Sequence, residues 1–184
     1  MKRGGIMNKR KILKTVKWTV GVLVSVYVLF FLLFLYNCSG WSQLEEDGAF
    51  RIYYHKWSGD VLVGDYCWDG DENNMTVTIP DEADGKKINS LGGSIGRGAP
   101  VLFLVNIPDS VEKSGEYNFT VKLGENIKSV YHFLYTDKFT NANGELAYVV
   151  NYYYEVSEDN KWIYSKDGKL YDKKTDELLG VTSD

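Results

Sequence analysis

The longest uninterrupted apolar run lies near the amino terminus, at residues 18–36 (WTVGVLVSVYVLFFLLFLY), and none of its residues is charged. As a helix, at about 1.5 Å per residue, it would span about 28 Å, close to the roughly 30 Å hydrocarbon core of a bilayer. Trp18 and Tyr36 lie at its two ends, and aromatic side chains favour the membrane–water interface. The pattern predicts a transmembrane helix over residues 18–36.

Beyond this run, polar and apolar positions change over much shorter distances. Residues 37–50 are mostly polar and are predicted to form a tether. The following runs FRIYYHKW (50–57) and DVLVGDYCW (60–68) are rich in aromatic and β-branched residues, which favours strands. MTVTIP (75–80) alternates, and it ends at a proline that cannot donate to a central ladder. Residues 51–184 are therefore predicted to form one mainly β domain.

The charge distribution predicts the orientation of the span. Seven Lys and Arg residues and no carboxylate precede residue 18, so residues 1–17 are expected to stay cytoplasmic. The rest of the chain carries 14 Lys and Arg residues against 25 Asp and Glu residues. A domain this acidic lacks the basic footprint of a nucleic-acid-binding protein. We expect a single-pass plasma-membrane protein whose carboxy-terminal domain is extracellular.

Two alternatives concern the end of the span. A cleaved signal peptide usually has an apolar region of about 7–15 residues followed by small residues. Here the run is longer and continues into YNCSG, which favours an uncleaved anchor. Tyr36 and Asn37 are too bulky for a lipoprotein signal before Cys38. Cys38 and Cys67 could pair outside the membrane; the alternative, which we favour, is that Cys67 is a small buried hydrophobe.

Internal repeats refine the prediction of fold. Aligning IPDEADGKKINSLGG with IPDSVEKSGEYNF places Ile88 on Val111 and Leu91 on Ser114, both 23 residues apart. A third copy, LGENIKSVYHFLY, places Val111 on Ile127 after only 16 residues. A period of 20–29 residues is typical of leucine-rich repeats, in which each unit buries its apolar edge against a neighbour.

These segments resemble the BspA-type leucine-rich repeats of bacterial surface proteins. VNIPDSVEKSGEYNF keeps six residues of the family's unit, namely Ile107, Pro108, Ser110, Val111, Gly115 and Phe119. The stretch from residue 60 to the first Ile-Pro is similar to the family's entry hairpin, and VSEDNKWIYSKDGKLYDKKTDELLGV to its closing meander. The resemblance implies a short, irregular solenoid with a carboxy-terminal β-meander cap, and a role in adhesion or interaction rather than catalysis.

The acidic residues of the stretch 157–179 are interpreted as turn-forming residues rather than as a catalytic or metal-binding loop. KWIYS and KLYD flank Asp167-Gly168, a dipeptide that favours a tight hairpin turn. Three strands there are predicted to bury Ile163, Leu170, Leu178 and Leu179. The carboxylates of this stretch are predicted to be solvated turn residues: Glu158, Asp159, Asp167, Asp172, Asp176 and Glu177.

Other candidate motifs are incomplete. DGDENN (69–74) resembles the start of an EF-hand loop, but Asn74 replaces the glycine and Pro80 the bidentate glutamate, so only weak calcium binding stays open. LGGSIGRG (91–98) lacks the lysine of a phosphate-binding loop. His55 and His132 lie outside any motif for nucleophilic catalysis. The sequence predicts no enzyme, no cofactor and no metal site.

Aromatic residues are the strongest remaining signal, with 14 Tyr and 5 Trp. Tyr53, Tyr54, Trp57 and Tyr153 form the candidate binding surface, because exposed Tyr and Trp favour recognition. The alternative is that the aromatics fill a core poor in leucine. The resulting hypothesis is a membrane-anchored cell-surface module that recognises a protein or glycan. The alternative is an accessory subunit or sensor acting through its helix, where Gly21 and Ser25 have a helix-packing spacing.

Overall fold

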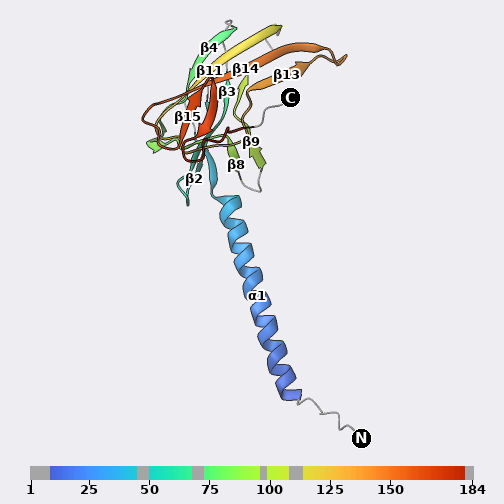
Figure 1. Ribbon diagram of the computed structural model, residues 1–184. Helices are drawn as coiled ribbons and strands as arrows, with labels where there is room; N and C mark the ends of the chain where they lie inside the picture. Colours follow the sequence, from blue (N-terminus) through green and yellow to red (C-terminus); the bar gives the residue numbers. More distant parts are fainter. Residues whose placement is uncertain (1–8, 45–49, 68–72, 96–98, 108–113, 181–184) are drawn as a thin grey trace. The chain divides into compact units, whose positions relative to one another are not determined.

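The computed structural model of the chain describes residues 9–44, 50–67, 73–95, 99–107 and 114–180. The chain divides into two compact units, Met1–Ser39 and Gly40–Asp184 (Figure 1). The first contains a single helix and the second is built of β-strands, so the chain is mainly β with one apolar helix near the amino terminus.

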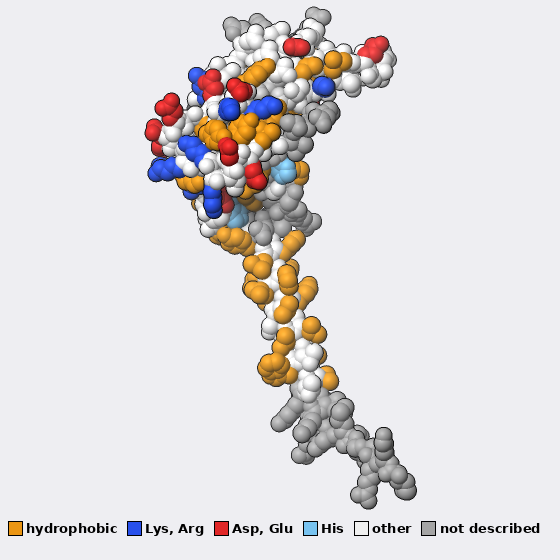
Figure 2. All heavy atoms as spheres, in the orientation of Figure 1, with side chains coloured by type: hydrophobic (Ala, Val, Ile, Leu, Met, Phe, Trp, Pro, Cys, Tyr) orange, Lys and Arg blue, Asp and Glu red, His pale blue; other side chains and the backbone are white. Residues whose placement is uncertain are grey.

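Helix α1 runs from Lys9 to Ser39, and its segment Thr15–Tyr36 is long and apolar enough to cross a membrane, a test that a signal sequence also passes. Hydrophobic side chains cover most of this segment (Figure 2). The Ser25 hydroxyl donates to the carbonyl of Gly21 at 2.9 Å, so this polar group is satisfied within the helix. The predicted helix at 18–36 is confirmed. It begins earlier because the basic residues before it are also good helix formers.

The strands of the second unit form two larger sheets and three hairpins. One sheet, called sheet A, has the order β1-β2-β3-β7-β12, with β10 also paired to β3. Its strands are β1 (Trp41–Leu44), β2 (Phe50–His55), β3 (Val61–Cys67), β7 (Ser90–Leu91), β10 (Leu104–Asn106) and β12 (Ser129–Val130).

The other large sheet, called sheet B, has the order β13-β14-β11-β4. Its strands are β4 (Asn74–Thr78), β11 (Gly115–Leu123), β13 (Thr136–Thr140) and β14 (Leu146–Val156). The hairpins are β5 (Glu82–Ala83) with β6 (Lys86–Lys87), β8 (Gly93–Ile95) with β9 (Ala99–Val101), and β15 (Ile163–Lys166) with β16 (Lys169–Asp172).

Parallel strands dominate the centre of both sheets, and the chain alternates between them. It passes from β3 in sheet A to β4 in sheet B, then to β7, β11, β12 and β14. Within each sheet, these successive strands are parallel neighbours: β3-β7-β12 in one and β4-β11-β14 in the other. Parallel neighbours need a crossover connection, and here each crossover passes through the opposite sheet.

Three asparagines mark the register of sheet B. Asn118 lies opposite both Asn74 and Asn151. Their amides form a ladder, in which Asn118 donates to Asn74 at 3.0 Å and Asn151 donates to Asn118 at 3.1 Å. The segments that begin at these asparagines therefore lie side by side with their residues in register: NMTVTI, NFTVKL and NYYYEV.

The core is one cluster of buried side chains with members from both sheets. The strand pattern predicted for MTVTIP is confirmed, because Val77 and Ile79 are buried while Thr76 and Thr78 are exposed. Large aromatic rings fill much of the core, as the alternative interpretation of the tyrosines proposed. They include Phe103, Tyr117, Phe119, Phe133, Tyr152 and Tyr154.

The segment predicted as a tether contains a strand. Trp41–Leu44 forms β1 and pairs antiparallel with β2. The Trp41 ring packs on His55 with 4.9 Å between ring centroids, and Leu44 packs against the core. These two apolar residues, spaced three apart in a polar stretch, give the segment enough contact to cover the open edge of β2.

The repeat alignment holds for its outer copies and fails for the middle one. Leu91 and Val130 are direct register partners in sheet A, as the alignment of the first and third copies requires. Ser114, aligned between them, is exposed and lies outside sheet A. Being polar, Ser114 does not provide the buried side chain that the position needs. Val111 lies outside the described residues.

The carboxy-terminal prediction is correct in its first two strands. Ile163 is 1% exposed and Leu170 is 0% exposed, and Asp167 takes a φ of 53° at the β15–β16 turn. The third strand is reduced to an isolated bridge between Leu178 and Tyr171. Burial of Leu178 was therefore wrong, since its side chain is 40% exposed. Leu179 is partly buried against the core.

Candidate binding surfaces

The four aromatic residues predicted to form a binding surface do not lie on one surface. Tyr53 and Tyr54 are half-buried in β2, and Trp57 is 44% exposed in the turn that follows. Tyr153 is 47% exposed in β14 of the other large sheet. Tyr53 and Tyr54 are consecutive in β2, so their side chains lie on opposite faces of sheet A, and of the two Tyr54 packs against the core. The prediction of one surface made of these four residues is therefore wrong.

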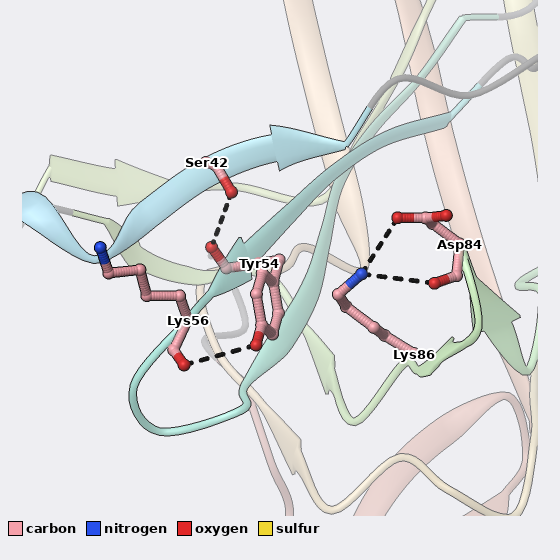
Figure 3. Close-up of polar contacts among 5 residues, drawn as sticks. All are labelled: Ser42, Tyr54, Lys56, Asp84 and Lys86. Carbon is pink, nitrogen blue, oxygen red and sulfur yellow. Dashed lines mark hydrogen bonds and ion pairs between the residues drawn. The ribbon is translucent and has the colours of Figure 1, made fainter.

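Tyr54 is held by contacts from three segments (Figure 3). The Ser42 hydroxyl of β1 donates to its carbonyl at 3.5 Å, and its own hydroxyl donates to the carbonyl of Lys56 at 3.4 Å. The Lys86 ammonium lies 4.9 Å from the Tyr54 ring centroid, within cation–π range. Lys86 also pairs with the Asp84 carboxylate at 3.0 Å, which holds the ammonium beside the ring.

A hollow of about 530 Å³ opens beside Tyr54. We call it the Tyr54–Trp162 hollow, after the aromatic residues that line it. Three lysines and two asparagines also contribute, and its lining residues are Tyr54, Gly59, Lys86, Lys87, Asn89, Asn126, Lys128 and Trp162. No carboxylate belongs to this lining. The hollow is therefore a basic and aromatic site on an acidic domain.

Backbone pairing places the lining residues in a row across sheet A. Tyr54 pairs with Val61, and Val61 exchanges hydrogen bonds with Asn89 at 3.0 and 3.1 Å. The Lys128 amide then donates to the Asn89 carbonyl at 2.8 Å. Three strand spacings of about 4.8 Å separate Tyr54 from Lys128, so the row extends about 14 Å.

Trp162 extends this row on the side of Lys128. The Lys128 ammonium lies 5.5 Å from the Trp162 ring centroid. Asn160 fixes the segment before Trp162, because its buried amide donates to the carbonyls of Gly124 and Ile127. The Asn160 side-chain oxygen accepts from the Trp162 amide at 2.9 Å. The ring is thus carried by an anchored backbone.

The lining residues other than Tyr54 were missed from the sequence, although a signal was present. Three buried isoleucines, Ile88, Ile127 and Ile163, are each flanked by lining residues. The flanking residues are Lys87, Asn89, Asn126, Lys128 and Trp162. The repeat alignment already matches Ile88 to Ile127 through Val111, but it leaves out Ile163, which lies 36 residues further along the chain.

Tyr153 occupies a different, flatter surface on sheet B. It lies beside Thr120 in register, and Thr120 lies beside Thr76. A shallow depression there is lined by Asn74, Met75, Thr76, Glu116, Asn118, Thr120 and Tyr153. The predicted exposure of Tyr153 is confirmed. The residues that line this depression are neutral apart from Glu116, so it differs in charge from the hollow.

A histidine, a serine and an aspartate meet in the β2–β3 turn. His55 Nδ1 lies 2.7 Å from Ser58 Oγ, and the Ser58 hydroxyl donates to Asp60 Oδ2 at 2.5 Å. A nucleophilic serine must instead direct its proton to the histidine, with the carboxylate on the other side of the ring. The observed order is that of a turn held by its side chains.

The carboxylates of the carboxy-terminal stretch also have turn roles. Asp172 accepts from the amides of Thr175 at 2.8 Å and Lys174 at 2.7 Å, and these bonds lower the pKa of its carboxyl. Asp176 accepts from the Tyr164 hydroxyl, and this bond raises the pKa of Tyr164 to about 12. Within the described part of the chain, His, Cys, Asp and Glu side chains form no metal-binding group of three or more.

Two of the sequence motifs lie partly outside the described residues, and the prediction for Cys67 is wrong. Most of the EF-hand-like stretch 69–74 lies outside the described residues, as does the end of the glycine-rich stretch 91–98. Cys67 is an exposed free thiol at the end of β3, so its interpretation as a buried hydrophobe was wrong. Its position at the strand end explains this, because the side chain lies beyond the core.

Comparison with known proteins finds no matching family, no similar curated protein and no similar solved structure.

Proposed function

We propose that the chain is a membrane-anchored cell-surface binding module that recognises a protein or glycan and carries out no catalysis. In this proposal α1 is an uncleaved single-pass anchor with a cytoplasmic amino terminus, and Gly40–Asp184 is the extracellular recognition domain. The observation that carries the proposal is the Tyr54–Trp162 hollow, because convergent polar groups and aromatic rings in a concave site are the usual features of a binding site.

We further propose that the β domain is a short, irregular leucine-rich-repeat solenoid of the BspA type with a β-meander cap. Two observations support this. Successive strands alternate between two sheets and are parallel neighbours within each, as coils of a solenoid are. The Asn74–Asn118–Asn151 ladder keeps equivalent residues in phase from coil to coil. Asn160 and the β15–β16 hairpin would close the last coil.

Replacing the apolar helix with an unrelated one distinguishes binding by the outer domain from action through the helix. The full chain is placed in nanodiscs and applied to arrays of cell-surface glycans and proteins. A second chain carries an unrelated apolar helix in place of residues 18–36. The proposal predicts saturable retention that is the same for both chains. No retention, or retention that depends on the native helix, would contradict it.

A further inference from the structure

We propose that the Tyr54–Trp162 hollow binds an anionic saccharide, that is, an oligosaccharide whose sugars carry carboxylate or phosphate groups. This inference rests on the proposed binding function and specifies its ligand class. It starts from three properties of the hollow: its charge, its aromatic rings and its length.

The charge of the hollow differs from that of the domain around it. Lys86 is already paired with Asp84, but among the described residues Lys87 and Lys128 form no ion pair. Two unpaired ammonium groups in one concave site attract an anion, and the concave wall strengthens the local field. Lysine acts on carboxylate and phosphate as a point charge with three donors.

The aromatic rings add a second requirement. Tyr54 and Trp162 lie at the two sides of the lysines, and each ring has an ammonium within 5.5 Å of its centroid. Trp162 is 39% exposed, so part of its ring is open to a ligand. An amphipathic ring of this kind suits a ligand with an apolar face and polar edges. A sugar ring has both, whereas a free inorganic anion has neither.

The length of the hollow favours an oligomer. Tyr54 and Lys128 are about 14 Å apart along the row of strands, and Trp162 lies beyond Lys128. A single sugar would contact only one end. Asn89 lies between Tyr54 and Lys128 in this row, and Asn126 also lines the hollow. Their amide groups can donate to and accept from hydroxyl groups. A chain of several sugars with regularly placed anions would contact both rings and both unpaired lysines.

The test measures binding of defined probes to the full chain in nanodiscs of zwitterionic lipid, by isothermal titration calorimetry. Tetragalacturonate supplies sugar with carboxylate, and a phosphorylated mannotetraose supplies sugar with phosphate. Maltotetraose supplies sugar without charge, and hexaglutamate supplies carboxylate without sugar. We expect at least one charged saccharide to bind about tenfold more tightly than both single-feature probes, and to weaken as salt is raised. Comparing the two charged saccharides identifies the anion.

Variants locate the site. Lys87→Ala combined with Lys128→Ala is expected to weaken binding about tenfold, and Trp162→Ala about fivefold. Lys138→Ala is the matched control, because it removes an exposed lysine from sheet B, outside the hollow. It should change the dissociation constant by less than about twofold. All four side chains are exposed, so these changes leave the core intact.

Three results would overturn the inference. Charged saccharides could bind no better than maltotetraose, hexaglutamate could bind as tightly as they do, or Lys138→Ala could weaken binding as much as the double variant. If the chain is retained on the glycan and protein arrays and the Lys87/Lys128 variant is retained equally, the anionic-saccharide inference fails while the proposed binding function stands.

Discussion

Replacing Asn160 with alanine is expected to destabilise the β domain where the carboxy-terminal hairpin joins it. The side chain is 1% exposed and makes four hydrogen bonds to backbone groups. It donates to the carbonyls of Gly124 at 2.9 Å and Ile127 at 2.8 Å. It accepts from the amides of Trp162 at 2.9 Å and Ile163 at 3.0 Å. One side chain therefore joins the turn before β12 to the start of β15.

The magnitude follows from these four bonds. A typical intramolecular hydrogen bond contributes about 1 kcal/mol net, and a buried group left without a partner costs about 1–3 kcal/mol. The bonds to Ile127 and Ile163 are buried, and the other two are partly buried. Water can hydrate the latter groups after the substitution. We expect Asn160→Ala to lower the free energy of unfolding by about 4 kcal/mol, a large part of the stability of an ordinary domain.

The assay is urea unfolding of residues 40–184, followed by tryptophan fluorescence. With a slope of about 2 kcal/mol per molar urea, the midpoint should fall by about 2 M. Asn143→Ala is the matched control, because Asn143 is exposed in the β13–β14 connection. Its free energy of unfolding should change by less than about 0.5 kcal/mol. Equal midpoints for Asn160→Ala and the wild-type chain would refute the anchoring role.

Three further predictions concern the same domain. Ile163→Asp places a charge at a site that is 1% exposed and should lower the free energy of unfolding by several kcal/mol, measured in urea. Asp167→Asn should lower it by less than about 0.5 kcal/mol, because Asn-Gly suits the same turn. A larger loss for Asp167→Asn than for Ile163→Asp would contradict the turn interpretation. Burial raises the pKa of Tyr154 well above the ordinary value for tyrosine, so the unfolded chain loses this proton first, and the stability that Tyr154 contributes should fall above about pH 10. Burial also raises the pKa values of Tyr135 and Tyr152, so Tyr154→Phe should reduce the decrease without removing it. A decrease above about pH 10 that is as steep in Tyr154→Phe as in the wild-type chain would exclude this account. Gly92→Ala should destabilise the domain far more than Gly59→Ala. Both glycines have a positive φ, but a Cβ at Gly92 would lie 1.9 Å from the carbonyl oxygen of Tyr131, whereas a Cβ at Gly59 would meet open space. Similar thermal unfolding midpoints for the two variants would contradict the packing at Gly92.

The local structure of the chain was largely predictable because it depends on patterns among residues that are close in sequence. Alternation marked β4, an uncharged apolar run marked α1, and Asp167-Gly168 marked the hairpin turn. Each of these three elements is present in the structure. The strand within the predicted tether was missed because only two apolar residues, Trp41 and Leu44, hold it against the rest of the domain.

The register between the strands of sheet B was harder to predict because it depends on residues far apart in sequence. Asn74, Asn118 and Asn151 are separated by 44 and 33 residues, so a fixed period cannot align them. The segments between these strands differ in length, while hydrogen bonding between the amides keeps the three asparagines in register. The hollow was missed for the same reason, since Lys86 and Lys87 lie in β6 and Lys128 precedes β12, and only the packing of the fold brings them together.

The placement of the β domain is tested most directly by the thiol of Cys67. This side chain is exposed at the end of β3, and Cys38→Ser makes it the only thiol in the chain. Intact cells expressing the variant are treated with a membrane-impermeant maleimide, then fractionated and analysed by mass spectrometry. An outer domain on an uncleaved anchor predicts labelled, full-length protein in the membrane fraction of intact cells. Labelling only after lysis, or a labelled product that lacks residues 1–36 and is released into the medium, would contradict it.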